Sequence, residues 1–487
     1  MSLGRGAARG AAWNLASVLG ERCFGFAVLV ILLRHVSVSD VGVIAIASAI
    51  SEIGRMVTSG GSGEQVVASP GDRSVEAGAF WAQFLLSLVA AALLVAISPL
   101  LARVYGDHAL GWVTRTLSVN IVIGAFLIVP SARLAQRFGF RTLGLMSLGS
   151  TILGGAVALA LVFTGYDLGA LIAQRMVGVA FYAAAAAIAA RWRPPALPPA
   201  AVIRSALRFN VPMMGAAFVD YIAITGYVVL IGARIPVIAV GQFRIAQRLS
   251  EVLQELAVFP AAKVFLPVFV AVRDNPERRF AVARALMDAL AIVSFGVAAV
   301  AGAAAKPIVI LMFGQRWAEA APVFAALSLI VPAAALYAFV NPMLTALKRP
   351  GLVSAFAALN ALTIALAAWI AAPSGLVPLA WTLAARGGLA ALVLLPALSI
   401  GIGRSAWPLL RLFFAPLAAL VAARVMAAIL LNAAATAPLF VQLMLGAGIA
   451  ALVFLGVMML LAPARIVLLA GRLILVLRPS PVVSEIA

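Results

Sequence analysis

The sequence predicts an all-α protein that crosses a membrane many times, and three observations support this fold class. Hydrophobic residues make up 65% of the 487-residue chain, and the mean hydropathy is +1.14. Only 10% of the residues are charged, whereas a soluble globular protein has about 25%. Apolar segments of about 20 residues, the length that spans a bilayer as a helix, follow one another along almost the whole chain.

Fourteen such segments are expected to form membrane-spanning helices. They lie at residues 12–33, 40–59, 78–102, 111–130, 143–164, 169–190, 209–232, 238–262, 284–305, 318–341, 351–371, 376–400, 406–430 and 437–462. Glycine and proline mark several of their ends. The first segment follows two arginines, as a signal peptide does, but Glu21 and Arg22 interrupt it. We therefore expect it to form the first span.

The distribution of basic residues predicts the orientation in the membrane. With the N-terminus placed in the cytoplasm, 22 of the 35 Lys and Arg residues lie in cytoplasmic segments, 6 on the opposite side and 7 within spans. Because cytoplasmic loops of membrane proteins are enriched in Lys and Arg, both termini are expected in the cytoplasm. The net charge of +19 then needs no nucleic-acid partner, since the basic residues are not gathered on one soluble face.

An internal repeat relates two halves of the chain. Residues 41–52 read VGVIAIASAISE and align without gaps with residues 240–251, which read VGQFRIAQRLSE. Further matches follow in the same order, at 99–106 with 307–314 and at 130–137 with 342–349. Chance similarity between apolar helices is the alternative explanation, and the order of the three matches disfavours it. Six spans separate the copies, so both halves are expected to have the same orientation, as in parallel-repeat transporters.

The repeat and the polar interruptions predict four parts. An N-terminal six-helix half covers residues 1–190, and a cytoplasmic linker rich in Pro and Arg covers 191–208. A C-terminal six-helix half covers 209–400. Two additional helices and an amphipathic cytoplasmic tail cover 401–487.

Ionised residues near the middle of predicted spans mark the candidate site. A single charge at the bilayer centre costs about 2.5–3.5 kcal/mol, so several charges indicate a water-filled path or mutual pairing. They concentrate in spans 1, 2, 7 and 8, which the repeat relates as two pairs. The basic members are Arg22, Arg55, Arg244 and Arg248, and the acidic members are Glu21, Glu52, Asp220 and Glu251. Arg175 in span 6 and Arg386 in span 12 are further interior charges.

Two interpretations of this set remain open. In the first, the four arginines line a central cavity between the two halves and bind the phosphate of an anionic head group, because a guanidinium binds phosphate bidentately and stays charged. The acidic residues then balance the arginines or take up a coupling cation. In the second, the carboxylates neutralise the arginines in interhelical pairs that only fix the packing. Outside this set, Arg424 is expected to snorkel to the membrane interface, and Asp288 is expected to cap the start of the span at 284–305.

Several classes of site are excluded or disfavoured. The single cysteine, Cys23, excludes an internal disulfide, and the two isolated histidines give no metal-ligand spacing. No Walker motif is present, which disfavours ATP-driven transport by this chain alone. We therefore expect no catalytic residues, no metal and no cofactor.

Short motifs recur in an order that is typical of one transporter family. They are AAWN at 11–14, LRHVSVSDVG at 33–42, FW at 80–81, YGD at 105–107, RFGF at 137–140, FP at 259–260, FGQRW at 313–317 and AAP at 320–322. With these motifs the chain resembles the polysaccharide transporter family of flippases, within the multidrug/oligosaccharidyl-lipid/polysaccharide exporter superfamily. The resemblance implies fourteen spans, a groove for the lipid tail at spans 13 and 14, and a lipid-linked oligosaccharide substrate, commonly on undecaprenyl pyrophosphate.

The expected function is thus to move a lipid-linked oligosaccharide across the bacterial inner membrane by alternating access, for exopolysaccharide, capsule or O-antigen synthesis. Expected partners are this substrate, membrane lipids and a polysaccharide polymerase or export complex. A multidrug or cation exporter of the same superfamily and a flippase for the peptidoglycan precursor remain as alternatives. A membrane enzyme is disfavoured, because the predicted outer loops are too short to carry an acceptor site.

Overall fold

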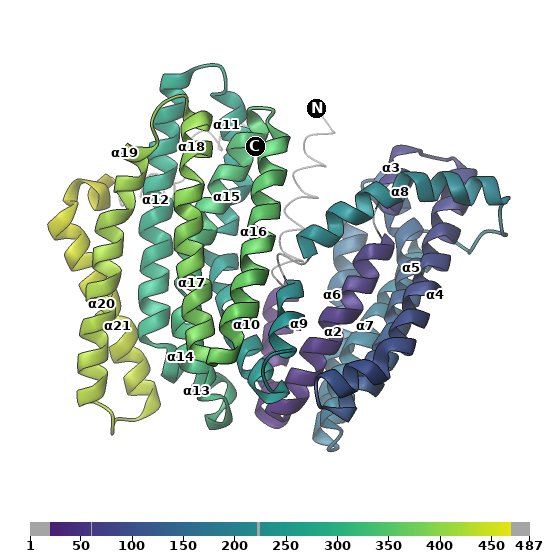
Figure 1. The fold of residues 1–487 in the computed structure, drawn as a ribbon, viewed down its shortest axis with the longest axis horizontal. Helices are drawn as coiled ribbons and strands as arrows, with labels where there is room; N and C mark the ends of the chain where they lie inside the picture. Colours follow the sequence, from purple (N-terminus) through teal and green to yellow (C-terminus); the bar gives the residue numbers. More distant parts are fainter. Residues whose placement is uncertain (1–19, 60, 222–224, 469–487) are drawn as a thin grey trace, which may run out of the picture. The chain divides into compact units, whose positions relative to one another are not determined.

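The computed structural model describes residues 20–59, 61–221 and 225–468, and over these residues it contains helices and no strand. This confirms the predicted all-α fold. Residues 20–35 form a helix ahead of α2. The helices that follow (Figure 1) are α2 (Val38–Ser59), α3 (Ser62–Ala68), α4 (Arg73–Val104), α5 (His108–Gln136), α6 (Phe140–Phe163), α7 (Asp167–Ala189), α8 (Ala200–Tyr221), α9 (Tyr227–Gly232), α10 (Val237–Ala257), α11 (Phe259–Ala271), α12 (Pro276–Ala303), α13 (Ala305–Phe313), α14 (Ala320–Leu327), α15 (Ile330–Ala346), α16 (Pro350–Ala371), α17 (Leu376–Val393), α18 (Leu395–Ile402), α19 (Trp407–Leu410), α20 (Phe414–Ala433) and α21 (Leu439–Leu461).

Among the described residues, ten helical stretches are long and apolar enough to cross a membrane. They coincide with the predicted spans 3–6 and 9–14. The other four predicted spans, 1, 2, 7 and 8, are those in which the interior charges concentrate, and a total of fourteen is not confirmed. α2 and α10 have sufficient length, at 22 and 21 residues, but both carry charged side chains. Predicted span 7 falls on α8 and α9, and predicted span 1 begins outside the described residues.

The helices belong to two compact units. Unit 1 comprises Met1–Arg244 with Ile364–Pro373, and unit 2 comprises Ile245–Thr363 with Ser374–Ala487. The division therefore falls inside α10. α8 begins at Ala200, within the segment expected to be a linker, and residues 463–468 of the expected amphipathic tail are helical. The rest of that tail lies outside the described residues, and the four predicted parts stay a prediction.

Each unit has its own buried core of aromatic and aliphatic side chains. In unit 1, Phe80 packs against Trp192, with ring centroids 5.2 Å apart. In unit 2, the rings of Phe339 and Phe269 lie 5.2 Å apart in one cluster, and Phe454 belongs to a second cluster formed by α12, α20 and α21.

The predicted repeat is visible in the backbone at the ends of helices. A residue with positive φ follows four helices in the first part of the chain, and a second series follows four later helices, 208 to 212 residues further on. The pairs are Gly106 with Gly314, Phe138 with Lys348, Gly165 with Gly375, and Arg191 with Gly403. A left-handed residue ends a helix by directing the next N–H groups to free carbonyls. After Phe138 and Lys348 the same bond forms, from Gly139 N to Leu134 O at 2.8 Å and from Arg349 N to Leu344 O at 3.1 Å.

Within unit 1, the repeat-related helices α2 and α10 cross at their glycines. A Cβ atom added to Gly42 would lie 2.0 Å from the carbonyl oxygen of Val237. A Cβ atom added to Gly241 would lie 2.2 Å from the carbonyl oxygen of Val38. Val38 and Gly42 correspond to Val237 and Gly241 in the repeat, so the contact is reciprocal. Only glycine lets the two backbones approach this closely.

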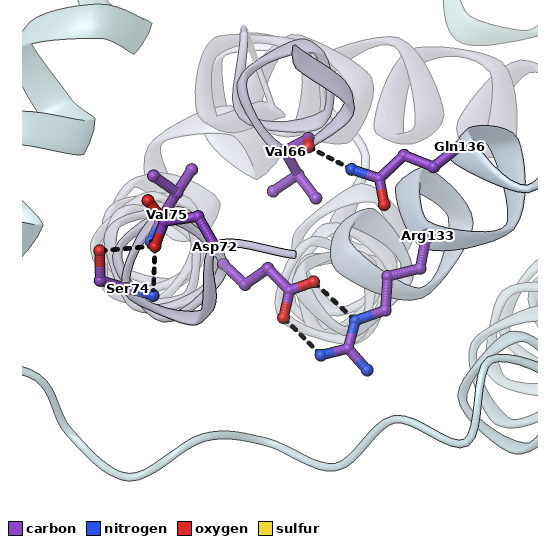
Figure 2. A network of polar contacts seen from close by, with 7 residues as sticks. Val66, Asp72, Ser74, Val75, Arg133 and Gln136 are labelled. Atoms are coloured by element: carbon purple, nitrogen blue, oxygen red, sulfur yellow. Dashed lines mark hydrogen bonds and ion pairs between the residues drawn. The ribbon is translucent and has the colours of Figure 1, made fainter. Parts of the chain in front are cut away.

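The start of α4 is capped by Asp72 (Figure 2). Its Oδ1 accepts hydrogen bonds from the backbone N–H groups of Ser74 at 2.9 Å and Val75 at 3.2 Å, and from the Ser74 hydroxyl at 2.8 Å. The Ser74 hydroxyl and the two N–H groups favour the ionised carboxylate and hold the pKa of Asp72 below its usual value. The cap satisfies two of the N–H groups that a helix start leaves without partners.

A largely buried ion pair joins α4 to α5. Arg133 donates from Nε to Glu76 Oε1 at 2.7 Å and pairs a second time through Nη2 (Figure 2). The Glu76 side chain is 8% exposed and that of Arg133 is 25% exposed. One turn later in α5, Gln136 donates to the Val66 carbonyl of α3 at 2.5 Å. These contacts fix α3, α4 and α5 at one end of unit 1.

Arg424 of α20 lies inside the helix packing of unit 2. It donates from Nη1 to Ala325 O at 3.0 Å and from Nη2 to Ala298 O at 2.8 Å, and it also bonds the Ser328 hydroxyl. The expectation that Arg424 snorkels to the interface is wrong. The last carbonyl groups of a helix have no N–H partner within that helix, and the guanidinium of Arg424 donates to one of them, Ala325 O in α14.

α12 begins eight residues before the span that was predicted for it. Asn275 is its N-cap and accepts a hydrogen bond from Arg278 N at 3.0 Å. Asp288 lies more than three turns further along and forms an ion pair with Arg465. The expectation that Asp288 caps this helix is therefore wrong, because a partner distant in the sequence uses its carboxylate.

Candidate functional site

A cluster of polar side chains lies within unit 1, on helices that pack around α2. α2 contacts α5, α7 and α8, and its first turns cross α10. The members are Glu52 and Arg55 of α2, Arg175 of α7, Tyr221 of α8 and Arg244 of α10. Arg175 lies within electrostatic range of Glu52, Arg244 and Tyr221, and Tyr221 lies within that range of Glu52 and of all three arginines. We call this group the arginine cluster.

Glu52 and Arg55 pair within α2. Arg55 Nε donates to Glu52 Oε2 at 2.8 Å, and Nη2 pairs with Oε1. The two side chains are 34% and 39% exposed, so the pair is accessible. One turn earlier, the hydroxyl of Tyr221 donates to the Ala49 carbonyl at 3.2 Å, which fixes α8 on α2 beside the pair.

The described side chains of the arginine cluster carry more positive than negative charge. Its described members include three guanidinium groups, from Arg55, Arg175 and Arg244, and one carboxylate, from Glu52, which pairs with Arg55. Asp220 precedes Tyr221 in the last turn of α8, but its side chain lies outside the described residues. An excess of guanidinium groups on predicted membrane helices suits an anionic ligand with several oxygen acceptors.

The continuation of α10 in unit 2 has the opposite balance. Arg248 Nη1 lies 3.1 Å from Glu251 Oε2 and 3.5 Å from Glu255 Oε1. Here one arginine meets two carboxylates. Beside them, the buried Ser250 donates to the Leu327 carbonyl at 3.0 Å, which fixes this face of α10 in unit 2.

Glu21 and Arg22 differ in their surroundings although they are neighbours in the sequence. Glu21 Oε2 accepts a hydrogen bond from the Ser147 hydroxyl of α6 at 2.6 Å. The Arg22 side chain is exposed. Of the four arginines predicted to bind phosphate, Arg55 and Arg244 therefore belong to the arginine cluster, whereas Arg22 and Arg248 lie in other surroundings.

Arg175 and Tyr221 were not among the site residues predicted from the sequence. The available signal for Arg175 was a single charge inside the otherwise apolar span at 169–190. The two pairs that the structure does form, Glu52–Arg55 and Arg248–Glu251, each lie within one helix at a spacing of three residues. They do not tie helices together, which is the role that the second interpretation gave them.

Comparison with known proteins identifies the family. Residues 31–322, more than half of the chain, match a family described as polysaccharide biosynthesis protein. The chain belongs to this family. The succinoglycan biosynthesis transport protein ExoT of Rhizobium meliloti (strain 1021) is 25% identical over 331 residues. That match covers 66% of this chain and 65% of ExoT. This chain therefore spans slightly less than two thirds of the length of ExoT.

Solved transporters have a similar fold. The lipid II flippase MurJ in an inward closed conformation matches with a TM-score of 0.72 at 12% identity, over 93% of this chain and 99% of that one. An inward-facing multidrug resistance MATE family transporter of the MOP superfamily matches with a TM-score of 0.60 at 13% identity, over 80% and 95%. Identities this low show the fold alone.

The chain is thus a member of a family of polysaccharide biosynthesis proteins, and it has the fold of MurJ and MATE transporters. Its described residues include ten helical stretches that are long and apolar enough to cross a membrane. The relatives are named as transporters or flippases rather than as enzymes. The cytoplasmic position of both termini stays a prediction.

Proposed function

We propose that this protein is a flippase that moves a lipid-linked oligosaccharide, of the undecaprenyl pyrophosphate type, across the bacterial inner membrane. The glycan would serve exopolysaccharide, capsule or O-antigen synthesis. The observation that carries the proposal is the excess of guanidinium groups over carboxylates among the described side chains of the arginine cluster. The similarity to a succinoglycan biosynthesis transport protein supports the class of cargo.

The chemistry of the cluster suits a pyrophosphate group. A guanidinium presents fixed pairs of N–H donors to phosphate oxygens, and it remains charged inside a membrane protein. The carboxylate of Glu52 pairs with Arg55 within one helix, and both side chains are partly exposed. An incoming phosphate can therefore reach Arg55 and take the place of the carboxylate.

Transport would follow by alternating access, in which the site is open to one side of the membrane at a time. Glu52 and Glu251 hold Arg55 and Arg248 while the site is empty, and Glu21 and Asp220 complete the set of charge-balancing or cation-coupling groups. Arg22 and Arg248 keep their proposed role in binding the head group. A polysaccharide polymerase or export complex would receive the glycan.

The charge of the cluster bears on the alternatives. A multidrug or cation exporter needs an acidic binding site, and the described side chains of the arginine cluster have the opposite sign. A flippase for the peptidoglycan precursor would bind the same pyrophosphate group, so the cluster does not separate it from our proposal. Cargo identity has to be measured directly.

The deciding experiment is a clean deletion strain. Surface polysaccharide and undecaprenyl-linked oligosaccharides in the membrane are measured together by mass spectrometry. Loss of polysaccharide with accumulation of lipid-linked repeat units supports the proposal and identifies the cargo. Unchanged glycans with new drug sensitivity would move the assignment to an exporter, and accumulated peptidoglycan precursor would move it to that pathway.

The role of the cluster is tested separately with Arg55→Gln, Arg175→Gln and Arg244→Gln in the complemented strain. Each change removes a charged hydrogen-bond donor, and we expect glycan export to fall about tenfold or more at equal expression. Arg22→Gln and Arg248→Gln test the remaining two arginines. Arg278→Gln, at an exposed arginine at the start of α12, is the matched control. Full export by all three cluster variants would refute the phosphate role.

A further inference from the structure

Unit 2 contains a pocket that is separate from the arginine cluster. Its volume is about 430 Å³, and it lies between one face of α12 and residues 464–468. Phe280, Arg284, Asp288 and Ile292 line it from α12, four residues apart, and Leu412 and Arg465 complete its wall. The pocket thus combines a charged part with an apolar wall.

The charged part is built on a fixed arginine. Arg465 forms an ion pair with Asp288 and donates from Nη2 to the Leu412 carbonyl at 2.9 Å. Its side chain is 17% exposed, and that of Asp288 is 23% exposed. These contacts use Nε and Nη2, while Nη1, which carries two further N–H donors, has no acceptor among the described residues. Arg465 can therefore donate to a ligand without leaving Asp288.

Arg284 supplies the second charge. Its side chain is exposed, and it forms no ion pair with any described residue. Since Asp288 balances only one of the two arginines, the pocket has a net positive charge and suits a single anionic group. Guanidinium groups bind the oxygens of a phosphate bidentately, so the two arginines suit the phosphate of a lipid head group.

The pocket lies at the depth of lipid head groups. α12 has 28 residues and is therefore about 42 Å long, whereas the hydrocarbon core of a bilayer is about 30 Å thick. All of its charged residues except Asp288 fall within the first nine positions, so the excess length lies at this end. Arg465 follows the end of the apolar helix α21 by four residues. Both arginines are thus placed just beyond the hydrocarbon boundary.

We propose that this pocket binds the phosphate of an anionic glycerophospholipid of the surrounding membrane. The phosphate contacts Arg284 and Nη1 of Arg465, and the start of an acyl chain lies against Ile292 and Leu412. A soluble anion would leave this apolar wall uncovered. A volume of about 430 Å³ is in the range of roughly 300–1,000 Å³ that small-molecule sites occupy, so a head group and the first part of one chain fit. The pocket shares no residue with the arginine cluster.

The test uses the full-length protein, purified and delipidated in a neutral detergent. Native mass spectrometry measures binding of phosphatidylglycerol, with phosphatidylcholine as the zwitterionic comparison. We expect Arg284→Gln to weaken phosphatidylglycerol binding about tenfold, as expected for the loss of a charged hydrogen bond, and Arg278→Gln on the same helix to leave it unchanged. Equal binding of phosphatidylglycerol to the wild type and Arg284→Gln would overturn the proposal.

Two further arms identify the source of the phosphate and the place of binding. Inorganic phosphate in excess should not displace phosphatidylglycerol, because it does not cover the apolar wall. Full displacement would overturn the lipid assignment. Ala289→Trp places a large side chain in the pocket and leaves both arginines unsubstituted. It should lower phosphatidylglycerol binding to a similar extent. Normal binding by Ala289→Trp, at an unchanged melting temperature, would show that the lipid binds elsewhere.

Discussion

α2 and α10 are two copies of one sequence, and the structure shows which part of that sequence has stayed the same. The pairs Ile46 and Ile245, and Ala47 and Ala246, are each at most 2% exposed in both copies. Glu52 and Glu251 also correspond. The arginines do not correspond. Arg55 follows its partner Glu52 by three residues, whereas Arg248 precedes its partner Glu251 by three residues.

The difference lies on the polar face. Arg244 and Arg248 stand where α2 has Ala45 and Ala49, so α10 carries two guanidinium groups at positions that are apolar in the first copy. The paired Ile and Ala positions, the glycine and the glutamate are the same in both copies, whereas the arginines are not. The shared part of the repeat therefore sets the packing, and we assign the binding chemistry to the part that differs.

The largest expected effect concerns the shared part. Gly42→Ala and Gly241→Ala each place a Cβ atom against a backbone carbonyl that cannot move without its helix. We expect each variant to lose about 3 kcal/mol of stability or more, because overpacking against backbone is not relieved by a rotamer change. Thermal unfolding of the purified proteins measures this.

Gly215→Ala in α8 is the control, since a Cβ atom there meets no atom within 4 Å. Because the contact is reciprocal, Gly42→Ala and Gly241→Ala should lose similar amounts of stability. A large loss of stability in one variant and none in the other would show that the two glycines are not equivalent.

A smaller effect is expected where only the first copy has an ion pair. Glu76→Gln leaves the largely buried Arg133 without its carboxylate, and we expect a loss of about 2 kcal/mol of stability, reduced from the fully buried case because Arg133 is 25% exposed. In α15, the corresponding helix of the second copy, Thr345 donates within its own helix, to Asn341 O at 2.8 Å. Thr345→Ala should therefore change the melting temperature little. If both variants unfold at the wild-type temperature, the pair does not hold α4 to α5.

The repeated glutamates should differ in a third measurement. Glu52→Gln removes the carboxylate that pairs with Arg55, whereas Glu251→Gln leaves Arg248 with Glu255. Both sites are accessible, so the expected losses of stability are below about 1 kcal/mol, and that of Glu251→Gln is close to zero. Equal losses in thermal unfolding would show that Glu255 does not replace Glu251.

The smallest effect is a pH dependence that distinguishes the caps of α4 and α12. Because the pKa of Asp72 is lowered in the folded protein, its contribution to stability is fully present above the usual carboxyl pKa of 3.8. The contribution is lost as the pH falls through the lowered value. Asn275 caps α12 without a titrating group.

The measurement compares the wild type with Asp72→Asn by thermal unfolding at about pH 6 and about pH 2. The difference between the two proteins should be present at the higher pH and vanish at the lower one. Asn275→Asp should introduce the same dependence at α12. A difference that is independent of pH would mean that the Asp72 carboxylate does not titrate as described.

Hydropathy and the repeat were sufficient to predict the helical membrane fold and the ten apolar spans. They could not predict the partners of Arg424, because backbone carbonyls brought close by folding leave no signal in the sequence. Asp288 was misassigned for a related reason, since its partner Arg465 is 177 residues away. In the candidate site, charge inside apolar spans indicated Arg55 and Arg244, but only folding shows that Arg175 and Tyr221 join them.

The reciprocal contact of Gly42 and Gly241 has the geometry of the interface in a symmetric dimer, in which residue i of one subunit meets residue j of the other and j meets i. In a dimer of identical chains, every substitution at such an interface occurs twice, so any site on the axis must itself be symmetric. Joining the two copies in one chain removes that restriction. The glycines can keep the symmetric contact while Ala45 and Arg244, at equivalent positions, create a site with a different charge on each side of the axis.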